Sequence, residues 1–303
     1  MQQSYKYLDS LDDSQRAAVE YIDGPSLVIA GAGAGKTRVL TTKVAYLIDS
    51  GIDPWNILAL TFTNKAAREM RERIANIVGI NAARYLQMGT FHSVFSHILR
   101  TEAERIGYNP RFTIYDRSDS SSLIKTIIKE SGLDDKKYKP NTVLSRISWA
   151  KNRLILPESY ANDPGLLKSD SAANIPEVRN IYANYQKRLK AAEAMDFDDL
   201  LVYMYVLLCN NEDIRKKYVE RFEFVLVDEY QDTNYTQARI LDLLTRERKR
   251  ICVVGDDAQS IYAFAGQTST ISLTSPRHSP PQNYSSWKGI TVPLVALSKP
   301  QTV

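Results

Sequence analysis

A glycine-rich segment between an apolar run and a helical pattern constrains the fold of this chain most strongly. Residues 26–30 (SLVIA) have the composition of a buried strand, and residues 37–48 have the spacing of a helix. Between them lies AGAGAGKT, residues 30–37, whose small residues let backbone N–H groups turn toward one point. A strand, such a turn and a helix N-terminus together form a phosphate-binding loop. The segment therefore predicts an α/β fold that binds a nucleotide.

The residue types in this loop predict a role for each position. The pattern GxxxxGK[ST] has glycine where this chain has Ala30, so the chain matches the variant that admits alanine there. Lys36 is expected to reach the β- and γ-phosphates, and Thr37 to offer its hydroxyl to Mg²⁺. Glycine-rich turns without a ligand precede many other helices, but Gly-Lys-Thr after an apolar strand favours phosphate. The loop expected to surround the phosphates is Ala30, Gly31, Ala32, Gly33, Ala34, Gly35, Lys36 and Thr37.

Two adjacent acids follow another apolar stretch. Residues 222–227 (FEFVLV) are typical of a buried strand, and Asp228 and Glu229 come next. Asp228 is expected to hold Mg²⁺, and Glu229 to orient and deprotonate the water that attacks the γ-phosphate. By itself, a strand that ends in Asp-Glu is more often a solvated strand end. Together with the phosphate loop, these acids predict hydrolysis of a nucleoside triphosphate.

Strands and helices alternate over much of the chain. Further strands are predicted at 56–61, 85–88 and 250–254, and an amphipathic helix at 64–78. The alternation predicts a mostly parallel sheet flanked by helices, whose ligands bind beyond the carboxyl ends of the strands. Residues 102–194 differ, because they contain helical patterns joined by polar loops and no clear strand. This segment is predicted to be an inserted all-helical domain.

Composition limits the class of protein only weakly. The net charge is +4, but Arg277, Lys288 and Lys299 lie in an acid-free tail, so the rest of the chain is nearly neutral. Charge alone therefore does not argue for nucleic acid. No stretch reaches the roughly 18–20 unbroken apolar residues of a membrane span, and no membrane partner is expected. Cys209 and Cys252 have no metal-binding spacing and predict buried free thiols in the cytoplasm.

A series of short motifs runs in order from about residue 8 to residue 266. In chain order they are LDDSQ (11–15), the phosphate loop followed by Arg38, TFTNKAA (61–67), GTFHS (89–93), MDFDDL (195–200), DEYQDTN (228–234) and VGDDAQSIY (254–262). Together they resemble the N-terminal part, domains 1A and 1B, of UvrD/Rep/PcrA-like superfamily 1 DNA helicases. The resemblance implies a RecA-like ATP-binding domain 1A at 1–101 and 195–266, with the helical domain 1B at 102–194 between its two parts.

The resemblance also implies roles for individual residues. Gln15 reads the adenine edge, Arg38 joins the nucleotide-binding loop, and Gln259 senses the γ-phosphate. Lys36, Asp228 and Glu229 keep the catalytic roles already argued from the residues. Aromatic rings stack on the bases of a single strand, and polar side chains contact its phosphates or sugars. The residues with these DNA-binding roles are Phe62, Thr63, Asn64, Thr90, His92, Tyr262 and Phe264.

Some positions depart from the family pattern or have simpler explanations. Asp12 stands where the family usually has asparagine, and Ala265 stands where many members have an arginine that contacts DNA. Phenylalanines near strand ends, such as Phe62 and Phe91, are more often core aromatics, and a histidine such as His92 is more often a capping or core residue than a ligand.

The last segment, residues 267–303, has a different character. It is rich in Ser, Thr and Pro and has no acid, which predicts disorder. A reading of permitted codons one base earlier restores family-like sequence, so this tail is interpreted as a non-family, out-of-frame translation. Sequencing of the coding DNA tests that interpretation. The family's second motor domain, with motifs IV to VI and the arginines that complete the ATP site, is expected to be missing.

The sequence thus predicts the motor part of an ATP-dependent DNA helicase with ATP and Mg²⁺ as cofactors. By resemblance it moves 3′ to 5′ on single-stranded DNA and at single-strand/duplex junctions, and works with repair or replication proteins. Two alternatives stay open: a truncated, non-catalytic DNA- or protein-binding fragment, and the helicase subunit of a recombination nuclease. A P-loop kinase is a weaker alternative, since it has no use for aromatic DNA motifs.

Overall fold

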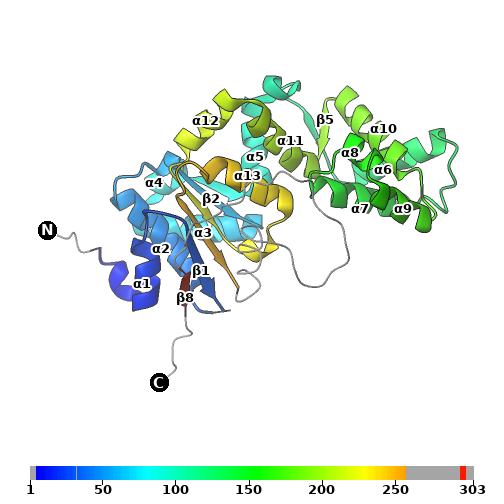
Figure 1. Cartoon of the computed structure of the whole chain (residues 1–303). Coiled ribbons are helices and arrows are strands. Elements are labelled where there is room, and N and C mark those ends of the chain that lie inside the picture. Colours follow the sequence, from blue (N-terminus) through cyan, green and yellow to red (C-terminus); the bar gives the residue numbers. More distant parts are fainter. Residues whose placement is uncertain (1–4, 32, 257–293, 298–303) are drawn as a thin grey trace. The chain divides into compact units, whose positions relative to one another are not determined.

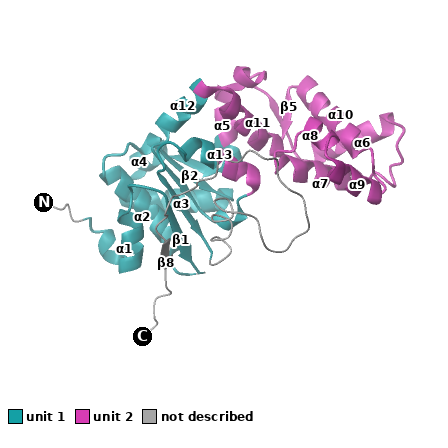
Figure 2. Ribbon diagram, viewed as in Figure 1, with its two compact units in different colours: residues 1–94, 213–233, 241–303 teal, residues 95–212, 234–240 magenta. Residues whose placement is uncertain are grey.

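The computed structural model describes residues 5–31, 33–256 and 294–297 (Figure 1). The chain forms two compact units, coloured separately in Figure 2. The first unit consists of residues 1–94, 213–233 and 241–303, and the second of residues 95–212 and 234–240. The second unit contains the whole segment 102–194. The assignment of that segment as a domain 1B with those boundaries stays a prediction.

The first unit is built on a six-stranded sheet in the order β3-β2-β6-β7-β1-β8, in which all neighbouring strands run parallel. Its strands are β1 (Ser26–Ala30), β2 (Ile57–Thr61), β3 (Gln87–Thr90), β6 (Phe224–Val227), β7 (Ile251–Gly255) and β8 (Leu294–Leu297). Its helices are η1 (Leu8–Ser10), α1 (Asp13–Glu20), α2 (Lys36–Asp49), η2 (Pro54–Asn56), α3 (Asn64–Val78), α4 (Ile80–Tyr85) and η4 (Tyr230–Asp232). Three helices have residues in both units: α5 (Phe91–Thr101), α12 (Glu212–Arg221) and α13 (Tyr235–Thr245).

One face of this sheet packs against helices α1 to α4. Alternate strand residues such as Val28, Ala59 and Leu226 form a continuous buried cluster with Val44 of α2 and Ile74 of α3. Strands β1, β2, β6 and β7 are buried along their whole length, as expected for a parallel sheet covered by helices. The buried strands hold the residues at their ends in fixed positions.

The second unit is mainly helical. Its elements are η3 (Ala103–Ile106), β4 (Thr113–Tyr115), α6 (Arg117–Glu130), α7 (Pro140–Lys151), α8 (Pro157–Ala161), α9 (Pro164–Ala172), α10 (Val178–Ala191), β5 (Ala194–Asp196) and α11 (Phe197–Asn210). Helices α6, α7 and α10 meet in a core that includes Ile127, Ile147 and Tyr182. Strands β4 and β5 pair in parallel, with Thr113 opposite Ala194.

The structure confirms the predicted α/β class with its parallel sheet and flanking helices. It corrects some local assignments. Tyr85 ends helix α4 instead of starting a strand, and β3 lies two residues later than predicted. The segment 102–194 is not all-helical, because Thr113–Tyr115 and Ala194–Asp196 form a small sheet. Three-residue strands are too short to show a periodicity in the sequence.

The predicted tail is described only at Leu294–Leu297, where β8 pairs with β1. The sequence analysis predicted no ordered element there, so β8 is an addition to the sheet. The rest of 267–303, with its predicted disorder, lies outside the described residues.

Two further findings concern cysteines and membranes. Cys252 in β7 is buried as predicted, but Cys209 near the end of α11 is exposed, so the prediction of a buried thiol is wrong there. Among the helices that the structure describes, none combines the length and the apolar character needed to cross a bilayer.

Candidate functional site

The carboxyl ends of five strands meet along one edge of the first unit's sheet. Since the strands are parallel, the residues that end or follow them share this edge. In strand order, the edge carries Thr90 at β3, Phe62 after β2, Asp228 after β6, Asp256 after β7 and residues 31–35 after β1. The fold therefore places residues that are distant in the sequence of the first unit along one edge of the sheet.

The loop after β1, the predicted phosphate-binding loop, contains two glycines with positive φ. Gly33 and Gly35 have φ of 82° and 88°, in the left-handed region that favours glycine. A Cβ at Gly35 would lie 2.8 Å from Gln15 Nε2, so a side chain there would also displace the glutamine. Among the described residues, no atom lies within 4 Å of a Cβ added at Gly31 or Gly33, so they leave the space beside these two glycines open. Ala32 lies outside the described residues.

Helix α1 holds Gln15 against this loop. The Gln15 backbone N–H donates to Asp12 Oδ1 at 2.8 Å, and the Asp12 N–H donates to Gln15 Oε1 at 3.4 Å, which forms a capping box. Gln15 Nε2 donates to the Ala34 carbonyl at 3.3 Å. A carboxylate caps a helix as well as asparagine does, so the departure at Asp12 leaves the cap intact.

Lys36, the first residue of α2, lies between carboxylates from two strands. Its Nζ is 3.5 Å from Glu229 Oε2, which follows β6, and it also donates to Asp256 Oδ1, which follows β7. Burial alone would lower the pKa of Lys36, but the hydrogen bond to Asp256 and the charges of Glu229 and Asp256 together raise it. Lys36 is therefore a fixed cation at the start of a helix.

Asp228 is the most deeply buried acid of the edge. It is 6% exposed, and its backbone N–H donates to the Leu60 carbonyl at 2.9 Å. Burial, together with the neighbouring charge of Glu229, raises the pKa of Asp228 to about 6. The ionised form is thus unfavourable in the folded chain, and a bound cation would favour it.

Asp228→Asn is expected to raise the free energy of unfolding by about 1–3 kcal/mol at pH 8. The pKa of Asp228 in the folded chain lies above its value of about 3.9 in the unfolded chain. The protonated acid therefore contributes its full stabilisation below about pH 3.9, and this contribution is lost as the pH rises through about 6. At pH 4 the gain should nearly vanish. Urea unfolding with a metal chelator present measures it, with exposed Asp53→Asn as the control. An equal gain in the free energy of unfolding at pH 4 and pH 8 would show that the raised pKa of Asp228 is not its cause.

The sequence analysis assigned no role to two residues that complete this cluster. Gln231 Nε2 donates to Glu229 Oε2 at 2.7 Å, and Gln231 Oε1 accepts the Asp256 N–H at 3.2 Å. Gln231 thus joins the ends of β6 and β7. A signal existed for Asp256, since it directly follows an apolar strand just as Asp228 does. Nothing in the sequence alone indicates the bridging position of Gln231.

A model of the UvrD/REP helicase N-terminal domain matches residues 11–278 of this chain. The chain belongs to the UvrD/REP helicase family. The match extends past Gly266, where the motifs read from the sequence end.

The relatives of this UvrD/REP chain include several proteins named ATP-dependent DNA helicase PcrA. The Bacillus subtilis (strain 168) protein is 42% identical over 295 residues, covering 95% of this chain and 39% of the relative. The Leuconostoc citreum protein is 44% identical over 259 residues, covering 85% of this chain and 34% of the relative. The Staphylococcus aureus (strain Mu50) protein is 42% identical over 260 residues, covering 86% and 35%. The chain thus spans 34–39% of the length of these relatives.

Other predicted residues of the nucleotide site have simpler surroundings. Thr37 is half-buried in the first turn of α2, and its carbonyl accepts a hydrogen bond from Thr41 Oγ1 at 2.9 Å. Arg38 is exposed. Gln259, the predicted γ-phosphate sensor, lies outside the described residues, as do Tyr262 and Phe264 of the DNA set.

The predicted DNA residues gather at the ends of β2 and β3. Phe62 is half-buried, and its ring centre is 5.6 Å from that of Phe91, which is a core aromatic at 1% exposure. Thr63 Oγ1 accepts the Ala66 N–H at 3.1 Å and caps α3, while Asn64 is exposed. These residues surround the N-terminus of α3, where backbone N–H groups are available to phosphate.

The segment after β3 resembles the one after β2. Thr90 Oγ1 accepts the Ser93 N–H at 3.1 Å at the start of α5. Burial lowers the pKa of His92 to about 4, so its imidazole is neutral at pH 7. A neutral His92 has no charge to attract phosphate, and any contact with DNA would be a hydrogen bond.

The second unit has a groove that sequence reasoning missed. Its volume is about 500 Å³, and it lies among the start of α6, the end of α7 and the β5–α11 junction. Two exposed aromatics line it, Trp149 at 42% and Phe197 at 57%. The Arg153 guanidinium carbon lies 4.1 Å from the centre of the Trp149 ring. Only the motif MDFDDL, which contains Phe197, pointed toward this region in the sequence.

Proposed function

We propose that this chain binds Mg-ATP at the β1–α2 loop and single-stranded DNA on the same sheet edge, and couples ATP hydrolysis to movement along DNA. One observation carries the proposal. Lys36, which follows the β1–α2 loop, contacts the carboxylates of Glu229, after β6, and Asp256, after β7. The PcrA relatives, named ATP-dependent DNA helicases, support the same activity.

The residues present fit Mg-ATP. The space beside Gly31 and Gly33 leaves room for phosphates, and Lys36 holds two carboxylates that phosphate oxygens would replace. The Asp228 carboxylate and the Thr37 hydroxyl are the hard oxygen ligands that Mg²⁺ prefers. When bound, the metal neutralises charge that develops on the phosphates. Gln15 is proposed to read the adenine, with Ala30, Ala34 and Arg38 completing the nucleotide pocket.

Within this site, Glu229 is proposed to accept the proton of the attacking water. It is half-exposed, and Gln231 holds one of its carboxylate oxygens at 2.7 Å. The Lys36 ammonium lies near the same oxygen, and this contact would be lost when the ammonium binds the phosphates of ATP. The carboxylate is therefore positioned by the protein before the reaction, which is how a general base gains efficiency.

On the DNA side, Phe62, Thr63, Asn64, Thr90 and His92 are proposed to contact a single strand. Phe62 offers a ring supported by Phe91, and the N-termini of α3 and α5 offer backbone donors. Contacts of this kind accept any base, which suits a motor that moves along the strand. Movement 3′ to 5′, unwinding at single-strand/duplex junctions, and action with repair or replication proteins in the cytoplasm are proposed from the family.

The test is the rate of ATP hydrolysis with and without single-stranded DNA, for this chain and for Lys36→Ala. We expect DNA to stimulate the rate, and Lys36→Ala to weaken Mg-ATP binding by about 100-fold, because losing hydrogen bonds from a charged donor to phosphates costs several kcal/mol. Lys168→Ala, which removes an exposed lysine of the second unit, is the control.

The outcomes separate the proposal from its rival. DNA-stimulated turnover that Lys36→Ala abolishes supports a working motor. DNA binding without any nucleotide binding would favour the alternative of a non-catalytic DNA-binding fragment, and would overturn the ATPase assignment.

A further inference from the structure

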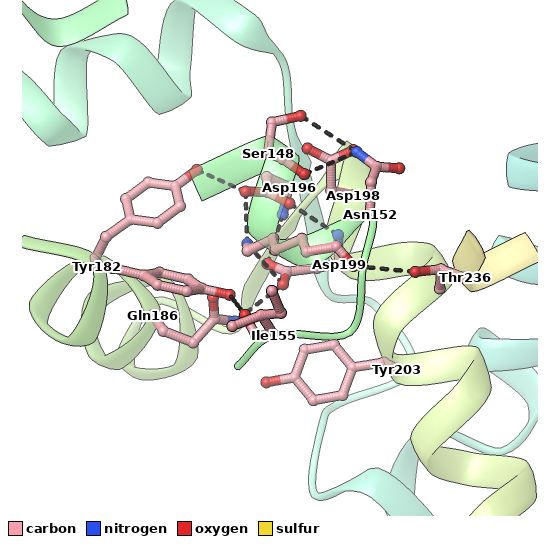
Figure 3. Close-up of polar contacts among 12 residues, drawn as sticks. Ser148, Asn152, Ile155, Tyr182, Gln186, Asp196, Asp198, Asp199, Tyr203 and Thr236 are labelled. Atoms are coloured by element: carbon pink, nitrogen blue, oxygen red, sulfur yellow. Dashed lines mark hydrogen bonds and ion pairs between the residues drawn. The ribbon is translucent and has the colours of Figure 1, made fainter. Parts of the chain in front are cut away.

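A polar network in the second unit shares Asn152, Asp196 and Asp198 with the lining of the groove (Figure 3). At its centre is Lys151, the last residue of α7, which is 1% exposed. Lys151 Nζ lies 2.7 Å from Asp196 Oδ2 and 2.7 Å from Asp199 Oδ1. The Tyr185 hydroxyl also donates to Asp196 Oδ2, at 2.9 Å. Such a network is rigid, because every member would be costly to leave unpaired.

The network fixes the position of Phe197 in the groove. Asp196 and Asp199 form a capping box at the start of α11, with the Asp199 N–H donating to Asp196 Oδ1 at 2.8 Å. Phe197 follows Asp196 directly and begins the helix. Lys151 therefore ties the end of α7, close to Trp149, to the start of α11, where Phe197 stands.

Asn152 extends this network in two directions. Its Nδ2 donates to Asp198 Oδ1 at 2.9 Å and to the Ser148 carbonyl at 2.8 Å, and both residues line the groove (Figure 3). Its Oδ1 accepts a hydrogen bond from Asn234 Nδ2. The single amide of Asn152 thus joins the groove wall to a residue far along the chain.

Asn234 is the last residue of the acidic segment DEYQDTN, which begins with Asp228 and Glu229. A second attachment stands beside it, since Thr236 Oγ1 donates to the Lys151 carbonyl at 3.0 Å and the Thr236 N–H donates to the Asn152 carbonyl at 3.3 Å. The chain that carries the two acids is therefore anchored, a few residues later, on the residues that shape the groove.

We propose that the amide contact between Asn152 and Asn234 links occupancy of the groove to the position of Asp228 and Glu229. This inference rests on the proposed function, and it takes the exposed rings of Trp149 and Phe197 as a place where bases of the bound single strand stack. Asn152 and Asn234 are positioning residues. Asn152 contacts the groove wall, and Asn234 ends the acidic segment. When bound DNA displaces the groove wall, Asn152 shifts with it. The two Thr236 hydrogen bonds attach the chain to the same groove residues, but the amide contact is the side-chain link nearest to the acids, and a short covalent segment leads from it to Asp228 and Glu229.

Asn234→Asp separates this link from the other task of Asn234. Asn234 Oδ1 accepts the Gln237 N–H at 2.9 Å at the start of α13, and an aspartate keeps that acceptor. The aspartate has no donor for Asn152 Oδ1 and places a negative oxygen against it. The variant thus breaks the link and retains the helix cap. Asn162→Asp adds the same charge at an exposed site of the second unit and is the matched control.

The measurement is the affinity for a fluorescent, non-hydrolysable ATP analogue with Mg²⁺, with and without a thymidine 20-mer. In the unaltered chain and in Asn162→Asp, we expect the oligonucleotide to change the analogue's Kd by about fivefold or more. In Asn234→Asp, we expect the factor to fall below about twofold, with the Kd in the absence of DNA unchanged. By linkage, the analogue should change the Kd for DNA by the same factor.

A second variant guards against a merely structural effect. Asn152→Ala breaks the same link from the other side, so the double variant should lose no more of the linkage than either single one. A linkage factor in Asn234→Asp equal to that of Asn162→Asp would overturn the inference, as would an unaltered chain that binds both ligands without any linkage. The first of these results leaves the proposed function intact, whereas the second would also remove the coupling of ATP hydrolysis to movement along DNA. An unaltered chain that binds no nucleotide would remove the proposed function and this inference with it.

Discussion

Replacing Lys151 with methionine is expected to lower the free energy of unfolding by about 3–5 kcal/mol. Lys151 is 1% exposed, and its ammonium lies 2.7 Å from a carboxylate oxygen of Asp196 and of Asp199. Burial alone would lower the pKa of Lys151, but the charges of these two aspartates raise it well above its ordinary value, so it stays charged. Methionine fills a similar volume and leaves two buried acids without their cation.

Urea unfolding followed by far-UV circular dichroism measures this loss. Lys125→Met, which removes an exposed lysine from α6 of the same unit, should change the free energy of unfolding by less than about 0.5 kcal/mol. A triple variant with Asp196→Asn and Asp199→Asn added should regain part of the loss, because it removes the uncompensated charges. A loss below about 1 kcal/mol in Lys151→Met would show that the aspartates find other partners or water.

The proposed nucleotide site is the part of the molecule with the clearest signals in the sequence. Its signals are local: an apolar run, small residues at a turn, and Lys36 at the start of a helix. Asp228 and Glu229 were proposed in the same way, because the carboxyl end of a buried strand is where parallel sheets place polar side chains, and the structure places both directly after β6. For these residues, neighbours in sequence are also neighbours in the site.

The rest of the site depends on contacts between distant segments, which a single sequence does not reveal. Asp256 reaches Lys36 only because β7 lies between β6 and β1 in the sheet. Asn152 and Asn234 form a pair that is 82 residues apart in the chain. The groove at Trp149 and Phe197 joins two helix ends, and a helical pattern predicts neither where a helix end lies nor what it faces. The sequence did not predict short elements such as β4 for another reason, since three residues give no period to detect.

The conformation of Glu229 bears directly on its proposed role. Its φ of 48° lies in the left-handed region, which costs a non-glycine residue about 1 kcal/mol or more. Strain of this kind persists where the surrounding structure fixes it, and here β6 precedes the residue and η4 follows it. The backbone thus turns sharply after Asp228, so that successive carboxylates differ in burial: Asp228 is 6% exposed, and Glu229 is half-exposed. The buried acid suits a metal, and the exposed one suits a base that exchanges protons with water.

Glu229→Gln is therefore expected to slow ATP hydrolysis by about 10²–10⁴-fold without weakening Mg-ATP binding, which separates a base from a ligand of the nucleotide. The amide keeps the length of the side chain and accepts the Gln231 hydrogen bond, but it takes up no proton. Loss of one negative charge beside Lys36 should leave affinity for a triphosphate unchanged or slightly higher. Phosphate release at saturating Mg-ATP with a thymidine oligonucleotide gives the rate, and fluorescence titration of a non-hydrolysable analogue gives the affinity.

Asp232→Asn, which changes an exposed acid of the same segment, is the control and should retain the full rate. If Glu229→Gln loses affinity and rate in equal proportion, the side chain positions the nucleotide, and another group accepts the proton.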